Sequence, residues 1–206
     1  MSSPHPDLPG HLADPAVMAD SSIEWTVSSS SREFSNDYLT VDIDTIVDPD
    51  DGEHPRVVVQ PHGAVGILAV DDQDRVLLVE QYRHPVRHRM LEIPAGTLDV
   101  EGEAALDAAV RELAEEADLA ADHWERELRL FSTPGYSSEE WTVFRASGLR
   151  PVPDEDRTDR VAEEADMQQW WLPFDAAVDA VLDGRIGDGM TVAAVLAEQV
   201  RRSRAG

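Results

Sequence analysis

Arg111-Glu112-Leu113-Ala114-Glu115-Glu116 places three carboxylates within five residues, directly after an arginine. At about 100° per residue, the three glutamates fall at roughly 0°, 300° and 40° on a helical wheel, an arc of about 100°. Four apolar residues fall together between about 100° and 160° and predict a separate packing stripe, namely Leu106, Val110, Leu113 and Ala117. We therefore expect a helix that packs through this stripe and presents clustered negative charge beside it.

Two interpretations of the glutamates are open. Asp and Glu make up 42 of the 206 residues, so a solvated acidic helix face arises by composition alone. The alternative is a site for Mg²⁺ or Mn²⁺, because these ions prefer oxygen ligands and would relieve the repulsion between neighbouring carboxylates. The preceding sequence favours the cation site. Residues 91–96 form an apolar run that ends in Pro94-Ala95-Gly96, and a polar loop leads from there to the helix.

The same stretch resembles the signature of the Nudix hydrolases, which cleave nucleoside diphosphates linked to another moiety. The signature positions are occupied by Gly96, Glu103, Arg111, Glu112, Leu113, Glu115, Glu116 and Leu119. The sequence departs from the common pattern in two places. Six residues separate Gly96 from Glu103 where five are usual, and Asp118 stands where a glycine usually follows the Glu-Glu pair. A motif of this kind is a hypothesis that its structural context must confirm.

The resemblance implies a fold and a set of roles. The fold is α+β, an α/β/α sandwich in which the motif helix packs on a mixed sheet, here preceded by an N-terminal β-segment. The implied ligands of Mg²⁺ or Mn²⁺ are Glu112, Glu115, Glu116 and the backbone carbonyl of Ala95. Arg111 and Glu115 are catalytic candidates in this helix. Arg111 is expected to pair with the structural residue Glu103 or to orient Glu112.

Composition excludes several classes of function. The net charge is −25 and all 17 basic residues are arginine, which argues against a nucleic-acid-binding surface. The sequence has no apolar run of eighteen residues and no charged-then-apolar N-terminus, so we expect neither a membrane span nor a secretory signal. The absence of cysteine is typical of a cytoplasmic protein.

The pattern along the chain predicts three segments: a disordered tail at residues 1–20, an N-terminal β-segment at 21–60 and a Nudix domain at 61–206. Alternation predicts a strand at 39–45, and the turn at 49–52 predicts a hairpin with a strand at 57–59. Further strands are expected at 63–70, 75–82, 128–131, 141–146 and 167–172. Two C-terminal helices are expected, one from Phe174 to a C-cap at Gly184 and one over 191–202.

Three features resemble the ADP-ribose pyrophosphatase subgroup. Pro134 lies sixteen residues after Asp118, although a turn after a strand would also explain a proline there. Residues 83–89 hold three arginines, and Arg83 matches the arginine that contacts the diphosphate in that subgroup. For Arg87 and Arg89 the alternative is that they offset nearby acids.

The third feature is the acidic loop at 161–167, which in the subgroup supplies a glutamate as general base. Glu163 fits that position best by its distance from Asp166, and Glu164 is the close alternative. Gly96 and Glu139 complete the substrate-binding candidates, with Arg83 and Pro134.

The implied reaction is metal-dependent hydrolysis of ADP-ribose to AMP and ribose 5-phosphate. Hydrolysis of another nucleoside diphosphate sugar, or of several, is the alternative. A non-catalytic nucleotide-sugar-binding module is a third possibility, but such proteins usually lose motif glutamates and gain a DNA-binding domain. The resemblance also implies a homodimer formed through the N-terminal β-segment.

Overall fold

The computed structural model describes residues 3–158 and 166–205, and its chain separates into two compact units. One unit is built from the residues up to Ser30 together with Asp44–Arg56, and the other from Ser31–Ile43 and the chain from Val57 onward. The division predicted from sequence, with boundaries at 20 and 60, stays a prediction. No helix within the described ranges is long and apolar enough to cross a membrane.

The N-terminal part of the chain forms strands. β1 (Ser3–Pro4) pairs antiparallel with β2 (His11–Leu12). β3 (Thr26–Ser35), β4 (Leu39–Val47) and β5 (Glu53–Pro61) form a three-stranded sheet in that order. The predicted turn is present, because the Asp48 carboxylate accepts hydrogen bonds from the N–H groups of Asp50 and Gly52 at 2.9 and 2.7 Å.

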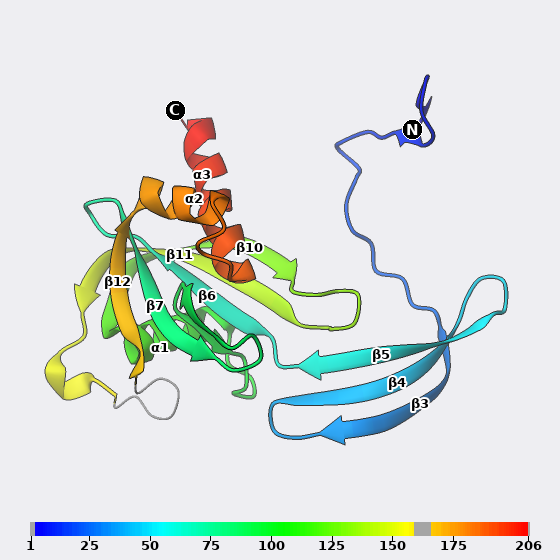
Figure 1. The fold of residues 1–206 in the computed structure, drawn as a ribbon, viewed down its shortest axis with the longest axis horizontal. Coiled ribbons are helices and arrows are strands. Elements are labelled where there is room, and N and C mark those ends of the chain that lie inside the picture. The colour runs from blue at the N-terminus through cyan, green and yellow to red at the C-terminus, as the bar shows by residue number, and fades with distance from the viewer. Residues whose placement is uncertain (1–2, 159–165, 206) are drawn as a thin grey trace. The chain divides into compact units, whose positions relative to one another are not determined.

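The second unit contains two further sheets and all the α-helices of the described chain (Figure 1). One sheet has the order β10-β11-β6-β9 and the other β12-β7-β8; β11 and β6 are parallel and the other pairs antiparallel. The strands are β6 (Ala64–Ala69), β7 (Arg75–Arg83), β8 (His88–Glu92), β9 (Ala95–Thr97), β10 (Leu119–Phe131), β11 (Glu140–Pro151) and β12 (Gln168–Pro173). The helices are α1 (Ala105–Ala117), the short 3₁₀ helix η1 (Asp154–Asp156), α2 (Phe174–Leu182) and α3 (Gly189–Ala205).

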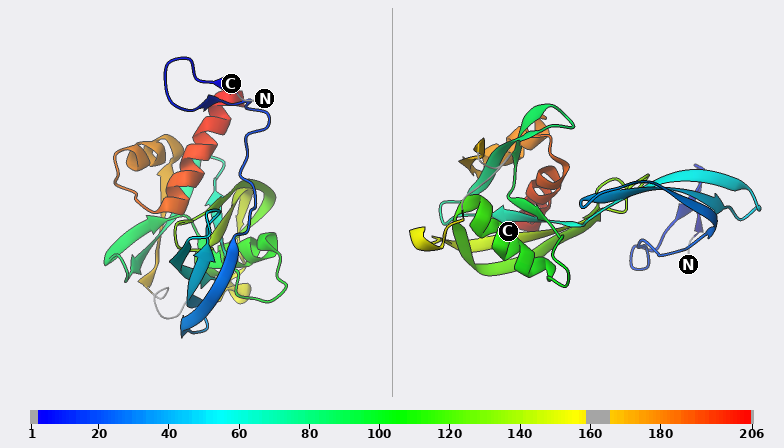
Figure 2. Two further views of the ribbon diagram at one scale, coloured as in Figure 1. Left: turned by 90° about the vertical axis from the view of Figure 1, so that its right-hand side faces the viewer. Right: turned by 90° about the horizontal axis from the view of Figure 1, so that it is seen from below.

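Strand β6 shows why the unit has three layers. All six of its residues are buried, and successive side chains point to opposite faces. Val65, Ile67 and Ala69 pack in one core with α1, whereas Leu68 and the following Val70 pack in the other with α2 and α3. The views in Figure 2 accordingly show α1 on the other side of the sheets from α2 and α3. This is the predicted α/β/α sandwich.

Most elements predicted for this unit are confirmed, with one strand mispredicted. α2 ends one residue earlier than predicted, because Asp183 is the C-cap and Gly184 follows it with φ of +72°. β10, however, begins at Leu119 and not at Leu128. Its first half carries mainly polar and charged residues from Asp122 to Glu127, so it lacks the apolar alternation from which a strand is predicted.

Candidate active site

Helix α1 packs through its glutamate face, so the predicted apolar stripe was wrong in part. Leu106 and Val110 are 40% and 43% exposed. The buried residues of α1 are Ala108, Ala109, Leu113, Glu116 and Ala117. The physical reason is size: alanines on this face let β6 and β9 approach the helix closely, and the larger Leu106 and Val110 are left outside.

Strand β9 lies directly against the glutamates of α1. The N–H of Ala95 donates to Glu116 Oε2 at 2.9 Å, and Glu116 is only 3% exposed. A Cβ at Gly96 would fall 2.0 Å from the carboxyl carbon of Glu112. The signature glycine is therefore required by contact with a signature glutamate, because any side chain there would occupy the space that the carboxylate fills.

Arg111 connects the remaining signature residues. Its guanidinium donates two hydrogen bonds to Glu103, at 2.9 and 3.1 Å, and one each to Glu112 at 2.6 Å and Glu115 at 3.1 Å. The hydrogen bond from Arg111 holds the pKa of Glu103 below its usual value. The ion pair with Glu103, one of the two alternatives predicted for Arg111, is present. Arg111 also contacts Glu112, and the alternative role of orienting it stays a prediction.

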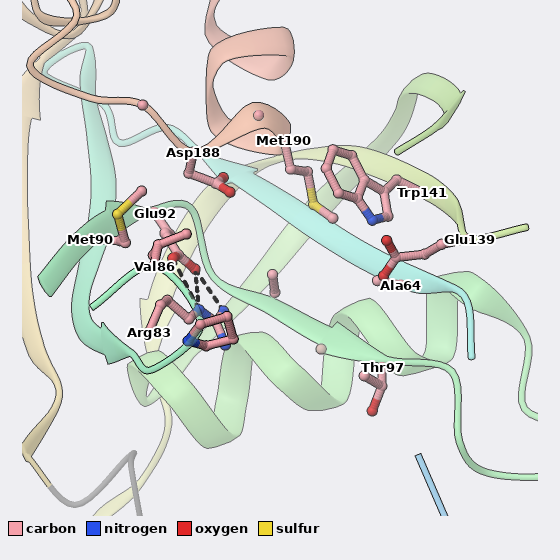
Figure 3. A pocket seen from close by; sticks show the side chains of 15 residues that line it. Ala64, Arg83, Val86, Met90, Glu92, Thr97, Glu139, Trp141, Asp188 and Met190 are labelled. Atoms are coloured by element: carbon pink, nitrogen blue, oxygen red, sulfur yellow. Dashed lines mark hydrogen bonds and ion pairs between the residues drawn. The ribbon is translucent and has the colours of Figure 1, made fainter. Parts of the chain in front are cut away.

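A cavity of about 470 Å³ opens on the strands around β9 (Figure 3). Ala95, Gly96 and Thr97 form part of its wall, and residues 187–190 before and at the start of α3 form another part. Figure 3 shows Arg83 and Glu92 at one side, with Glu139 and Trp141 at the other. The backbone that contacts the α1 glutamates is therefore also a wall of this candidate substrate pocket.

Arg83 does lie at this cavity, but a carboxylate holds it. Its guanidinium donates to Glu92, from Nε at 3.0 Å and from Nη2 at 2.6 Å. Burial alone would lower the pKa of Arg83, but the hydrogen bonds and charge of Glu92 outweigh it and raise the pKa. Arg83 remains 44% exposed, so its free edge is accessible, whereas Glu92 is 5% exposed.

The other predicted site residues have different outcomes. Glu139 lines the cavity, whereas Pro134 does not and lies exposed between β10 and β11. Arg89 offsets nearby acids, as its alternative interpretation proposed, by pairing with Glu80 and Asp166. The two general-base candidates, Glu163 and Glu164, lie outside the described residues. The catalytic roles themselves stay predictions.

A model of the NUDIX domain matches residues 60–193, more than half of the chain. The chain belongs to the Nudix family. It is a Nudix hydrolase with the signature helix, glycine and glutamates in contact.

Two relatives and one solved structure are similar to this chain. An ADP-ribose pyrophosphatase of Mycobacterium tuberculosis is 43% identical over 149 residues, which cover 72% of this chain and 70% of the relative. A GDP-mannose pyrophosphatase of Yersinia pestis is 33% identical over 138 residues, 64% of this chain and 67% of the relative. The crystal structure of an ADP compounds hydrolase shares the fold, with a TM-score of 0.75, 20% identity and coverage of 91% of this chain and 99% of the other.

The departure of this Nudix signature at Asp118 has a structural explanation. Asp118 is the C-cap of α1, with φ of 55° and ψ of 34°, and its N–H donates to Ala114 O at 3.1 Å. This left-handed conformation favours glycine, and among other residues aspartate tolerates it comparatively well. Asp118 therefore performs the turn from α1 into β10 that the usual glycine performs.

Nudix hydrolases generally use divalent metal ions, and the residues at β9 fit such an ion. Glu112 and Glu116 converge on the Ala95–Gly96 backbone, and carboxylate and carbonyl oxygens are the ligands that Mg²⁺ prefers. Within residues 3–158 and 166–205, no group of three or more His, Asp or Glu side chains is arranged to hold an ion as it stands. The carboxylates instead bond to Arg111 and to Ala95.

The contact at Gly96 gives a first prediction. Gly96→Ala places a methyl group on the Glu112 carboxylate, so the carboxylate must move. We expect hydrolysis to fall by about 10- to 100-fold, as when a group that holds a metal ligand in place is changed. The measurement is the rate at saturating Mg²⁺. Gly135→Ala is the matched control, because a Cβ there meets nothing within 4 Å. Equal loss in both variants would contradict the prediction.

Sequence reasoning overlooked the residues that complete the cavity. Glu92 lies within the apolar run at residues 91–96, and a single charged residue between Leu91 and Ile93 is the local signal of a buried ion pair. Asp188 and Met190 were missed because their contact with this site depends on how α3 packs back on the sheet. No local pattern encodes that contact.

Proposed function

We propose that this Nudix hydrolase cleaves the diphosphate bond of ADP-ribose to give AMP and ribose 5-phosphate. The observation that carries the proposal is the 43% identity to an ADP-ribose pyrophosphatase over a region that includes a complete set of signature glutamates. The position of these glutamates next to a cavity lined by Arg83 and Glu139 supports it. The cavity volume is in the range of small-molecule sites.

The proposed cofactor is Mg²⁺, held by Glu112, Glu116 and the carbonyl of Ala95, with Glu115 as a further ligand. When bound, such an ion offsets the charge of the diphosphate and lowers the pKa of water. Arg111 keeps the carboxylates aligned through its bonds to Glu112 and Glu115.

Arg83 acts on the substrate in this proposal. Glu92 fixes one edge of its guanidinium, and the exposed edge is left to bind a diphosphate oxygen. Glu163 or Glu164 takes the proton of the attacking water. The water oxygen forms a bond to phosphorus, and the bridging oxygen leaves with the other phosphate.

Product analysis tests the proposal. The protein is incubated with Mg²⁺ and either ADP-ribose, ADP-glucose or GDP-mannose, and the products are separated by ion-exchange chromatography. We expect ADP-ribose to be cleaved fastest, with equal amounts of AMP and ribose 5-phosphate. A much faster release of GMP from GDP-mannose would overturn this and support the second candidate, which the Yersinia pestis relative favours.

We further propose a cytoplasmic homodimer formed through the N-terminal β-segment. Supporting features are the absence of cysteine and three large side chains of that segment, Phe34, Tyr38 and Val57, which are 51%, 74% and 51% exposed. Exposed apolar groups of this size mark interaction surfaces when they cluster. Sedimentation equilibrium tests the dimer, and a monomer at micromolar concentration would contradict it.

A further inference from the structure

Thr191, in the first turn of α3, is fully buried, and its hydroxyl group bonds to a distant part of the chain. Its oxygen accepts a hydrogen bond from the N–H of Ile93 at 2.9 Å. The hydroxyl donates to Asp188 Oδ2 at 2.7 Å, and the same carboxylate oxygen accepts from the N–H of Thr191 at 2.8 Å. Asp188 therefore fixes the hydroxyl with its oxygen directed at Ile93.

The N–H of Ile93 has this partner because the sheet offers none there. The pairing of β8 with β7 ends at Glu92, and β9 begins only at Ala95. Pro94 between them has no N–H to donate, and its carbonyl accepts from Ile67 at 2.8 Å. Ile93 is 1% exposed, so without Thr191 its N–H would be buried and unsatisfied.

The two-residue connection Ile93–Pro94 joins both halves of the candidate active site. Glu92, one residue before it, holds Arg83. Ala95, directly after it, donates to Glu116, and Gly96 contacts Glu112. A shift of this connection would therefore move the phosphate-binding candidate and the metal-binding candidates together.

We propose that Thr191 is a positioning residue for the metal site, acting through Ile93 and the Ala95–Gly96 backbone. The inference rests on the proposed role of Ala95, Glu112 and Glu116 as ligands, and it assigns a function to the start of α3 that is separate from its packing. Groups that hydrogen-bond directly to metal ligands typically change metal affinity by about 10- to 100-fold when they are removed. Thr191 acts one step further out, through the N–H of Ile93, so we expect an effect at the lower end of that range.

Two pairs of variants isolate the hydroxyl group. Thr191→Val keeps the shape of the side chain and removes the hydroxyl, so it is compared with the parent. Thr191→Ser and Thr191→Ala both lack the methyl group and differ only in the hydroxyl. Mn²⁺ binding to the full-length protein is measured without substrate, from the electron paramagnetic resonance signal of free Mn²⁺, and folding is checked by circular dichroism.

We expect Thr191→Val to bind Mn²⁺ about tenfold more weakly than the parent, and Thr191→Ala about tenfold more weakly than Thr191→Ser. If Thr191 had a purely structural role, all three variants would be less stable, but Mn²⁺ affinity would not differ between the proteins with and without the hydroxyl group. Equal Mn²⁺ affinity within either pair would overturn the proposal. If Thr191→Val does not fold, the Ser and Ala pair decides.

Substrate assays remain separate from this test. Should the parent bind Mn²⁺ but fail to hydrolyse ADP-ribose, the proposed substrate is wrong while the role of Thr191 still stands or falls on the binding data. Conversely, suppose that the parent hydrolyses ADP-ribose and that Thr191→Val binds Mn²⁺ as tightly as the parent. The proposed substrate then stands, and only the positioning role of Thr191 is wrong.

Discussion

Glu116→Gln is expected to lower ADP-ribose hydrolysis by about a thousandfold or more at saturating Mg²⁺. Glutamine keeps the size of the side chain and still offers an oxygen to the N–H of Ala95, so the substitution removes charge and little else. Metal ions contribute several kcal/mol to such reactions, and each 1.36 kcal/mol is about tenfold in rate. Initial rates of AMP release measure the effect.

Asp107→Asn is the matched control for Glu116→Gln. Asp107 lies in the first turn of the same helix and is exposed, so its variant changes the net charge equally without touching the proposed ligands. We expect its rate to stay within twofold of the parent. Hydrolysis by Glu116→Gln at the parental rate would rule out the metal-site interpretation of the glutamates.

Among the substitutions proposed for this protein, Glu198→Gln is expected to lower the free energy of unfolding most. Glu198 on α3 is fully buried and accepts hydrogen bonds from Arg145, Arg201 and Arg202. Removing its charge leaves three guanidinium groups around a neutral side chain, which costs about 3 kcal/mol for a partner lost from a buried ion pair. For a chain of this length that lowers Tm by roughly 6–12 °C, measurable by thermal unfolding at pH 7.

The pH dependence of this loss has a definite sign. Burial raises the pKa of Glu198, but hydrogen bonds from Arg202 and Arg201 outweigh it, so the pKa lies below that of the unfolded chain. The stabilisation is therefore complete above the unfolded pKa of about 4.3 and is lost as the pH falls through the folded pKa. The difference in free energy of unfolding between the parent and Glu198→Gln should therefore shrink as the pH falls below the unfolded pKa. A difference that grows in acid would contradict this account.

An exposed ion pair serves as the control. Glu140 pairs with Arg129, whose side chain is 66% exposed, so Glu140→Gln should change the free energy of unfolding by about 1 kcal/mol or less. Comparable losses in Glu198→Gln and Glu140→Gln would show that burial does not determine the cost.

The sequence predicted the order of the elements well because their signals are local. The α1 glutamates, the turn at Asp48 and the left-handed Gly184 after α2 each depend on residues a few positions apart. The buried face of α1 was predicted wrongly in part: Leu113 and Ala117 are buried as expected, but Leu106 and Val110 are exposed. The wheel ranks residues by hydropathy, whereas the packing depends on the size of Ala109 and on the closeness of β9.

Contacts between distant segments could not be predicted. The Arg83–Glu92 pair depends on the register of β7 with β8, and Thr191 meets Ile93 across 98 positions of sequence. Both involve charged or hydroxyl groups whose burial is explained only by the partner. Nothing in the neighbourhood of Thr191 in the sequence distinguishes it from an ordinary residue in the first turn of a helix.

The position of Arg111 among three glutamates means that the helix carries its own counter-ion. The repulsion that would otherwise oppose folding of an acidic helix is compensated before any cation arrives. If Glu112 holds a cation as proposed, that cation would have to compete with the Arg111 guanidinium for its carboxylate. We therefore expect a chelator to abolish hydrolysis while leaving the free energy of unfolding unchanged.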